Sequence, residues 1–246
     1  MKLTGNTILI TGGTSGIGLA FAKEFLRLGN KVIICGRREN RLKEISHEHP
    51  AMITRRCDVA ESDDRESLAT WVLQQYPEVN VLINNAGLQL LTNLTGPVDL
   101  TRVNSEIAIN VVAPIHLTSL FTQTFVQKEN AAIINISSGL AFVPLAFMPV
   151  YCATKAAIHS ITLSLRHQLK DTSVKVFEIA PPAVDTELGA DRRADKTQSH
   201  GGMPVDEFLA EAIEAIRSDV FMAPIGGSKW LYDKRESMFE SMNQPA

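Results

Sequence analysis

Short apolar runs rich in β-branched residues alternate with amphipathic segments along most of the chain. The strand-like runs are residues 7–11, 31–35, 52–57, 79–84, 131–136 and 174–179. Most are apolar at successive positions, as in strands covered on both faces. Helical length and spacing fit residues 17–28, 64–75 and 106–126. This alternation predicts an α/β protein, a doubly wound parallel sheet with right-handed crossovers and helices on both faces.

Length and composition fit one domain, which we expect to span residues 1–246. Hydrophobic residues make up 45% of the chain and charged residues 21%, as in ordinary globular proteins. A chain of 246 residues can bury most of its apolar surface in one core. The formal net charge of −3 is too near neutral to indicate a surface for nucleic acid or for an anionic membrane.

Two stretches without Asp, Glu, Lys or Arg, 107–127 and 131–154, are as long as a membrane-spanning helix, and His116 is the one titratable side chain of the first. Asn110, Pro114 and Asn135 are among the polar and helix-breaking residues that they contain. A lipid-facing helix would leave such polar groups unpaired. We therefore interpret both stretches as buried interior and expect no membrane span.

Cys35, Cys57 and Cys152 show no Cys-x-x-Cys spacing. They indicate neither a disulfide framework nor a zinc cluster, and we expect no metal site. Residues 1–5 lead directly into an apolar run, without the pattern of a cleavable signal. These features predict a cytoplasmic protein.

The alternation stops after the sixth strand-like run. Residues 185–204 are polar and glycine-rich, and a loop of this length inside a domain is usually functional. We expect residues 187–204 to form a mobile lid over a substrate. Apolar residues at helical spacing within 205–216 then predict a core-facing helix.

The C-terminal tail, residues 224–246, has a weaker helical stripe. Its apolar residues are Leu231, Met238, Phe239 and Met242. The stripe would pack either on its own domain or on a partner subunit, and the pattern does not distinguish the two.

A glycine-rich turn follows the first strand and opens the first helix. Its glycines Gly12, Gly16 and Gly18 have the spacing Gly-x-x-x-Gly-x-Gly. Glycine permits a tight turn and lets backbone N–H groups approach a pyrophosphate, and the helix N-terminus adds a positive dipole end. A turn of this kind that binds nothing is the alternative interpretation.

This turn resembles the TGxxxGxG motif of the short-chain dehydrogenase/reductase family. Asn84-Asn85-Ala86-Gly87 matches the family's NNAG motif, and Cys57-Asp58-Val59 matches its position after the third strand. The resemblance covers residues 2–188 and implies a Rossmann-like dinucleotide-binding fold. It implies that Asp58 accepts a hydrogen bond from the adenine amino group; an ordinary turn or helix-capping role is the alternative.

The resemblance also implies which residues bind the cofactor. They are Gly12, Thr14, Ser15, Gly16, Ile17, Gly18, Asp58, Val59, Asn85, Ala86, Gly87, Tyr151, Lys155, Val184 and Thr186. Val184 and Thr186 follow Pro181-Pro182, where the family usually has Pro-Gly, and Pro182 cannot adopt a glycine conformation.

The end of the second strand indicates which dinucleotide is bound. A carboxylate there would hold a ribose 2′-hydroxyl, but this chain has Arg37 and Arg38. Guanidinium groups hold a 2′-phosphate, which a carboxylate would repel. Arg37 also matches a basic position of NADP-using family members, so we predict NADP(H). A solvated arginine pair at a strand end is the alternative.

Tyr151 and Lys155 lie four residues apart and share one face of a helix. Ser138 lies at the end of the fifth strand, and Asn110 lies in the preceding helical segment. The four spacings match the family's Asn, Ser, Tyr, Lys tetrad. Asn110, Ser138, Tyr151 and Lys155 are therefore the expected catalytic residues, with Ser138 preferred over Ser137 on family spacing alone.

The residue types suit carbonyl reduction. Hydride delivery to carbon needs an acid near the developing alkoxide, and we expect Tyr151 to be that acid. A nearby cation favours phenolate, so we expect Lys155 to lower the pKa of Tyr151. In the family the lysine also binds the nicotinamide ribose, the serine positions the substrate oxygen and the asparagine holds a proton-relaying water.

The substrate region is expected to be apolar. Leu140, Phe142, Val143, Leu145, Phe147 and Met148 lie between Ser138 and Tyr151, with residues 89–94 as another wall. We expect a mainly apolar carbonyl compound or alcohol, although several of these residues could simply pack in the core. Arg192 and Arg193 could meet an acidic group, but a solvated surface is the preferred interpretation.

The sequence thus predicts an NADP(H)-dependent oxidoreductase. A non-catalytic NADP-binding regulator and an isomerase or lyase on the same scaffold stay open as alternatives. Family members associate through long helices, here near 106–126 and 150–169. We therefore expect a homodimer or homotetramer.

Overall fold

The computed structural model describes residues 1–188, 199 and 201–244. Within these residues seven parallel strands form one sheet in the order β3-β2-β1-β4-β5-β6-β7. The strands are β1 (Thr7–Thr11), β2 (Lys31–Gly36), β3 (Ile53–Arg56), β4 (Val81–Asn84), β5 (Ala131–Ile136), β6 (Val174–Ala180) and β7 (Met222–Pro224). The predicted doubly wound α/β fold is confirmed.

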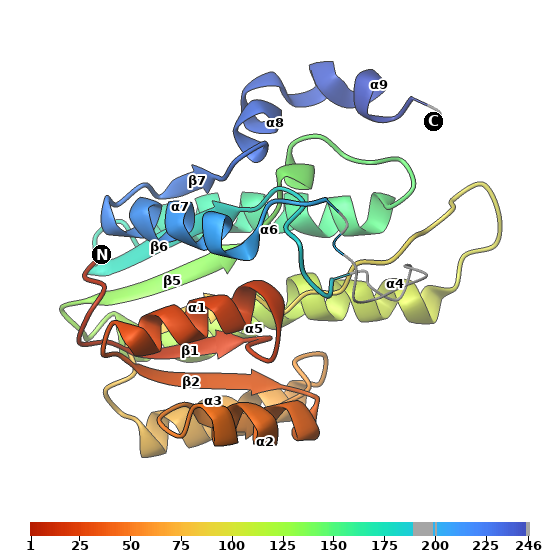
Figure 1. The fold of residues 1–246 in the computed structure, drawn as a ribbon. Helices are drawn as coiled ribbons and strands as arrows, with labels where there is room; N and C mark the ends of the chain where they lie inside the picture. The colour runs from red at the N-terminus through yellow and green to blue at the C-terminus, as the bar shows by residue number, and fades with distance from the viewer. Residues whose placement is uncertain (189–198, 200, 245–246) are drawn as a thin grey trace.

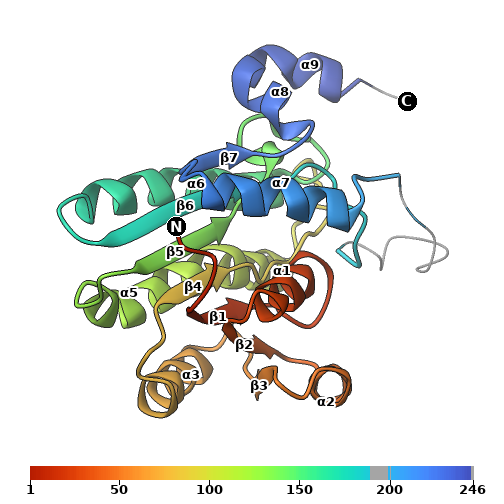
Figure 2. The same ribbon diagram turned by 60° about the vertical axis from the view of Figure 1, so that its left-hand side comes forward.

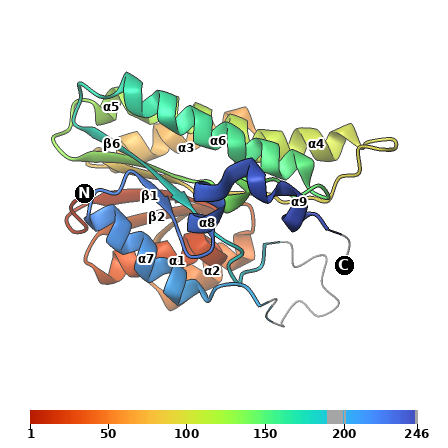
Figure 3. The same cartoon turned by 90° about the horizontal axis from the view of Figure 1, so that it is seen from above.

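Helices cover both faces of the sheet (Figure 1). They are α1 (Gly16–Arg27), α2 (Glu39–Glu48), α3 (Ser62–Gln75), α4 (Leu100–Ile107), α5 (Ala113–Phe125), α6 (Pro149–Gln168), α7 (Val205–Arg217), α8 (Ser228–Lys234) and α9 (Phe239–Met242). Seen from above, α1, α2 and α7 lie on one side of the sheet, and α3, α5 and α6 lie on the other (Figure 3).

Each face of the sheet has its own apolar core. On one face, Phe21 and Phe25 of α1 pack with Phe208 of α7 against the strands. On the other, Phe121 and Phe125 of α5 pack against the strands together with α3 and α6. Inward side chains on both faces explain why the strand sequences are apolar at successive positions.

The structure adds elements that the strand and helix patterns did not predict. Helix α2 follows Arg38, and half of its residues are charged, with Leu42 and Ile45 buried. Strand β7 has only three residues and pairs with the end of β6. The predicted core-facing helix after residue 204 is confirmed as α7.

The predicted helix 106–126 is one helical run interrupted by a π-helical turn, Ala108–Val112, between α4 and α5. An α-helix would require the N–H of Pro114 to donate to the carbonyl of Asn110. Proline has no N–H and its ring would clash there. We attribute the widened turn to this constraint.

The C-terminal tail folds onto its own domain. Leu231, Met238 and Met242 pack against a small cluster that contains Phe142 and Val143. Asn243 fastens the segment, because its Oδ1 accepts from Ala146 N at 2.6 Å and its Nδ2 donates to Pro144 O at 3.1 Å. Figure 2 shows α8 and α9 beyond β7 at one edge of the molecule.

None of the helices that the structure describes is long and apolar enough to cross a membrane. Most of the expected lid, including Arg192 and Arg193, lies outside the described residues.

Candidate active site

A cavity of about 1130 Å³ opens at the carboxyl ends of the strands. It is lined by most of the residues that the sequence singled out: Gly12, Thr14, Ser15, Gly16, Ile17, Arg37, Arg38, Asp58, Val59, Asn85, Ala86, Gly87, Ser138, Tyr151, Lys155, Val184 and Thr186. Gly18 and Asn110 lie outside this lining. The cavity has the size and position of a ligand site in a parallel α/β fold.

The glycine turn packs tightly against the end of β4. Gly12 has φ +66°, and a Cβ there would lie 2.8 Å from the Ala86 Cα. Asn85 Nδ2 donates to Thr11 O at 2.9 Å and to Gly12 O at 3.2 Å. A side chain on Gly18 would meet Asn85 Nδ2 and Gly12 O, so Gly18 is needed for packing of the turn.

Two arginines stand at one end of the cavity. Arg38 Nη2 donates to Ser15 Oγ at 2.8 Å and to Thr14 Oγ1 at 3.1 Å, while its Nη1 pairs with Glu187 at 2.9 Å. The hydrogen bond from Arg38 lowers the pKa of the Glu187 carboxyl. Arg37 Nη1 lies 3.7 Å from an Asp58 oxygen. Both guanidinium groups therefore lie near oxygen acceptors, hydroxyl groups or carboxylates, at the mouth of the glycine turn.

Asp58 makes a local turn beside these arginines. Its Oδ1 accepts from Ala60 N at 3.1 Å, and its own N–H donates to Asp64 Oδ2 at 2.7 Å. Buried Arg65 fixes the same loop from below by donating to Val59 O and Ala60 O. Asp58 therefore both stabilises a local turn and lines the cavity.

Val184 and Thr186 follow β6 on the opposite wall. Val184 forms an isolated bridge with Met203, and Met203 N donates to Ala183 O at 2.8 Å. A Cβ on Gly16 would lie 3.2 Å from the Thr186 Cβ. The segment after Pro182 therefore closes over the glycine turn.

Tyr151 and Lys155 lie on α6, and both are buried. Lys155 Nζ donates to Ile136 O at 2.9 Å and lies 5.7 Å from the centroid of the Tyr151 ring. Burial lowers the pKa of Lys155 from 10.5 to about 8, against the opposing effect of the negative charge of Glu178. Burial of the Lys155 ammonium close to the Tyr151 phenol therefore costs free energy in the folded state.

Asn110 stands behind the cavity in the π-helical turn. Its Oδ1 accepts from Leu88 N at 2.8 Å, and its Nδ2 donates to Leu88 O at 2.8 Å and to Thr154 Oγ1 at 3.0 Å. A Cβ on Gly87 would lie 3.7 Å from Asn110 Oδ1 and 3.9 Å from Lys155 Nζ. Asn110 therefore connects the segment after β4 to the helix of Tyr151 and Lys155.

The two serines after β5 have different contacts. Ser138 Oγ accepts from Leu140 N at 3.1 Å at the start of a short 3₁₀ turn. Ser137 Oγ donates to buried Glu178 at 2.6 Å. Only Ser137 is committed to an acidic group in the interior, which leaves Ser138 as the better candidate for a substrate contact.

The part of the cavity around Tyr151 is apolar. Leu140, Leu145, Phe147 and Met148 line it as expected, whereas Phe142 and Val143 are buried in the small core beneath the tail. Sequence reasoning missed the contribution of the tail, whose lining residues are Gly227, Trp230, Leu231 and Met242. The apolar residues at helical spacing in the tail were the available signal, but they did not show which surface the tail covers.

Comparisons with known proteins agree over most of the chain. A family model described as short chain dehydrogenase matches residues 6–197. The uncharacterized oxidoreductase DltE of Bacillus subtilis strain 168 is 49% identical, over 88% of this chain and 86% of that protein. The NADP-dependent 3-hydroxy acid dehydrogenase YdfG of Salmonella typhi is 32% identical, over 84% of this chain and 86% of that protein. A solved short-chain dehydrogenase from Sphingobium yanoikuyae in complex with NADPH has a TM-score of 0.81 and 27% identity, covering 92% of this chain and 91% of that one.

We predict that Lys155→Met stabilises the fold near neutral pH. A pKa lowered from 10.5 to about 8 corresponds to roughly 3 kcal/mol of unfavourable free energy for the ammonium in the folded state. Because Ile136 O loses its donor, the expected gain in unfolding free energy at pH 7 is smaller, about 2 kcal/mol.

The gain should depend on pH. Between pH 8 and 10.5 the unfolded chain holds more protons on this lysine than the folded chain, so wild-type stability rises with pH and the difference shrinks. Urea unfolding of both proteins at pH 7 and pH 10 measures this. A difference that stays constant with pH would contradict the assigned cost.

Proposed function

The chain belongs to the short-chain dehydrogenase family, and we propose that it is an NADP(H)-dependent oxidoreductase that acts on the carbonyl or secondary alcohol of a mainly apolar small molecule. The observation that carries the proposal is the shared cavity. Tyr151, Lys155 and Ser138 face the same space as the glycine turn and the two arginines. A dinucleotide and a substrate could therefore meet beside the phenol.

The residues of the cavity fit such a cofactor. Gly12 leaves room where any side chain would strike the backbone of Ala86, and the amino end of α1 points its N–H groups into the turn. The glycine turn would hold the pyrophosphate, Asp58 and Val59 the adenine, and Lys155 the nicotinamide ribose. When bound, the nicotinamide supplies a hydride to the carbonyl carbon.

The protein would supply the proton. Ser138 would position the substrate oxygen, and Tyr151 would donate its phenolic proton to that oxygen as negative charge develops there. The Lys155 ammonium favours the resulting phenolate because the two groups lie on one helix face. Asn110 would hold the water that returns a proton past Lys155.

NADP(H) is the preferred cofactor because of the donors at the arginine end of the cavity. Arg38 already binds two hydroxyl side chains and one carboxylate, Glu187. A 2′-phosphate offers oxygen acceptors to the same donors and carries more charge than a carboxylate. The NADPH of the Sphingobium yanoikuyae structure supports this choice.

We expect Arg38→Ala and Arg37→Ala each to weaken NADPH binding. A charge-assisted hydrogen bond is worth about 1.5–3 kcal/mol, so the Kd should rise roughly tenfold or more for Arg38→Ala, with little change for NADH. Arg217→Ala is the matched control, because Arg217 of α7 is an exposed arginine that pairs with Glu214 and does not line the cavity. Fluorescence titrations measure both constants; NADH bound by the wild type as tightly as NADPH would refute the preference.

Tyr151→Phe should abolish turnover while leaving the NADPH dissociation constant nearly unchanged. The ring keeps its packing, and only the acidic proton is removed. The assay follows NADPH absorbance across a panel of apolar ketones, aldehydes and acidic carbonyl compounds. Wild-type rates retained by the variant would exclude Tyr151 as the acid.

The same panel separates the alternative functions. Tight NADPH binding with no turnover of any compound would favour a regulator. A product formed without net oxidation of NADPH would favour an isomerase or lyase. Faster turnover of acidic compounds than of apolar ones would refute the proposed substrate class.

The proposal includes a cytoplasmic homodimer or homotetramer. Cys35, Cys57 and Cys152 are free thiols, as expected in a reducing compartment. Apolar side chains are exposed along the helices expected to associate: Ile107, Val112, Ile115 and Leu163. Such side chains suit a symmetric interface.

We expect light scattering to give the mass of a dimer or tetramer. Ile115→Glu together with Leu163→Glu should reduce that mass to the monomer, because each places a charge in the apolar contact. The same variants should keep NADPH binding, since neither residue lines the cavity. A wild-type monomer at working concentration would overturn this part of the proposal.

A further inference from the structure

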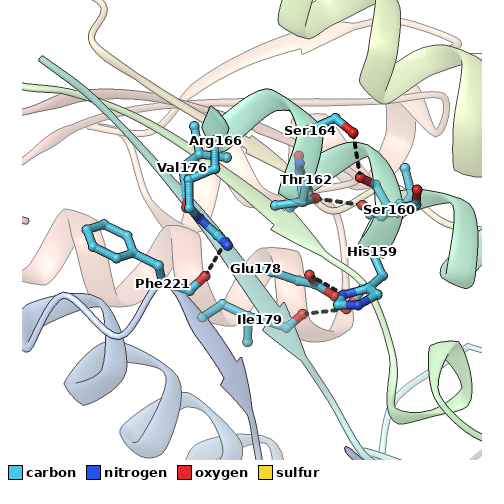
Figure 4. Close-up of polar contacts among 12 residues, drawn as sticks. His159, Ser160, Thr162, Ser164, Arg166, Val176, Glu178, Ile179 and Phe221 are labelled. Atoms are coloured by element: carbon cyan, nitrogen blue, oxygen red, sulfur yellow. Dashed lines mark hydrogen bonds and ion pairs between the residues drawn. The ribbon is translucent and has the colours of Figure 1, made fainter. Parts of the chain in front are cut away.

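A buried carboxylate with two polar partners lies directly behind the candidate catalytic residues. Glu178 of β6 has no exposed surface. Its Oε1 accepts from Ser137 Oγ at 2.6 Å, and its Oε2 lies 2.8 Å from His159 Nδ1. Figure 4 shows His159 of α6 facing Glu178 across the gap between helix and strand. We call Ser137, His159 and Glu178 the Glu178 cluster.

The cluster is built from the same two segments as the active site. The carbonyl of Ile136 holds Lys155 Nζ, the next residue is Ser137 of the cluster, and the one after is Ser138 on the cavity wall. On α6, His159 lies one turn beyond Lys155. A shift of the Glu178 side chain would therefore be transmitted to both catalytic segments.

A carboxylate without exposed surface is costly unless its oxygens are paired. Both oxygens of Glu178 have partners in the cluster. The Phe142 and His159 rings are nearly perpendicular with their centroids 5.1 Å apart, and the His159 side chain is only 16% exposed. The carboxylate is thus held in one position, in surroundings where its field is weakly screened.

Other charged groups surround the cluster. The charge of Glu178 acts on Lys155 and Arg166 of α6, and Arg235 of the C-terminal segment lies over the Phe142 ring. Arg166 donates hydrogen bonds to Val176 O and Phe221 O. Burial lowers the pKa of Arg166, and the negative charge of Glu178 opposes that effect. The Tyr151 ring lies 5.7 Å from Lys155 Nζ, and the Tyr232 ring of α8 lies beside Phe142 with ring centroids 5.0 Å apart.

We propose that Glu178 is a positioning residue for the reaction: its carboxylate, fixed by Ser137 and His159, keeps the buried Lys155 side chain in the ammonium form and holds the Ser137-Ser138 end of β5 in place. This rests on the proposed function of Tyr151 and Lys155. The carboxylate acts through Lys155 and does not touch the substrate.

The expected pH effect has a definite sign. Burial lowers the pKa of Lys155, and the negative charge of Glu178 raises it. The two effects together give a pKa of about 8. Removing the charge with Glu178→Gln must therefore lower that pKa further. The ammonium, which is present below its pKa, would then be lost at a lower pH.

The direct test is an NMR titration of the substrate-free protein labelled with ¹³Cε-lysine. Lys155→Met identifies the Lys155 signal by its loss. We expect half-titration near pH 8 in the wild type and at a lower pH in Glu178→Gln. Glu106→Gln is the matched control, because Glu106 is an equally buried carboxylate that accepts from Leu90 N. An unchanged titration in Glu178→Gln, or an equal fall in Glu106→Gln, would overturn the proposal.

A second variant keeps the test open if Glu178→Gln does not fold. Glu178→Met combined with His159→Phe removes the carboxylate together with its imidazole partner, a replacement that buried pairs often tolerate, and Ser137 Oγ keeps its 3.5 Å contact with Ile179 O. This double variant should also lower the pKa of Lys155. Glu178→Asp keeps the charge and should titrate above Glu178→Gln.

The activity arm uses the pH profile of kcat/KM for carbonyl reduction. Its alkaline limb should move to lower pH in Glu178→Gln and return toward the wild type in Glu178→Asp. A purely structural role would reduce the rate by the same factor at every pH, and that result would count against the proposal. If the wild type reduces no carbonyl compound, a shifted NMR titration still supports the role of Glu178 while the proposed function fails.

Discussion

The common direction of the central strands is the constraint on which the rest of the molecule depends. In the paired registers Asn84 of β4 lies beside Asn135 of β5, which lies beside Glu178 of β6. Because these strands end at one edge, the segments that follow them meet around a single cavity. Neither the glycine turn nor the serine segment makes such a site by itself.

The edge of the sheet that carries the candidate catalytic residues is also where the interior becomes polar. Asn84 Nδ2 donates to Asn135 Oδ1, and Asn135 Nδ2 donates to Thr162 Oγ1 of α6. The Glu178 cluster continues this polar seam between β5, β6 and α6 toward Lys155. Hydrogen bonds along this seam fix the position of α6 on the sheet more narrowly than apolar packing does, at the cost of desolvating each group; Asn84 Oδ1 is buried without a hydrogen-bond partner among the described residues. The placement of the buried ammonium relies on that precision.

Sequence patterns reached the elements with strong local signals. The apolar runs located six strands, and motif spacing singled out Ser138, Tyr151 and Lys155, although their roles stay predictions. The π-helical turn was missed because Pro114 acts on a carbonyl four residues earlier, which an apolar periodicity does not register. The Glu178 cluster was missed because its members are far apart in the chain and each is ordinary in its own segment. Strand β7 is too short to show a period.

The outer wall of the cavity lies outside the two large apolar cores that cover the faces of the sheet. Trp230, Leu231 and Met242 come from the tail, which Asn243 fastens to the loop at Pro144 and Ala146 rather than to the sheet. Substitutions in this wall would alter the outline of the cavity without disturbing the two sheet cores. Descendants of such a chain can therefore diverge in the molecules they accept while the fold and the residues around Tyr151 stay inherited.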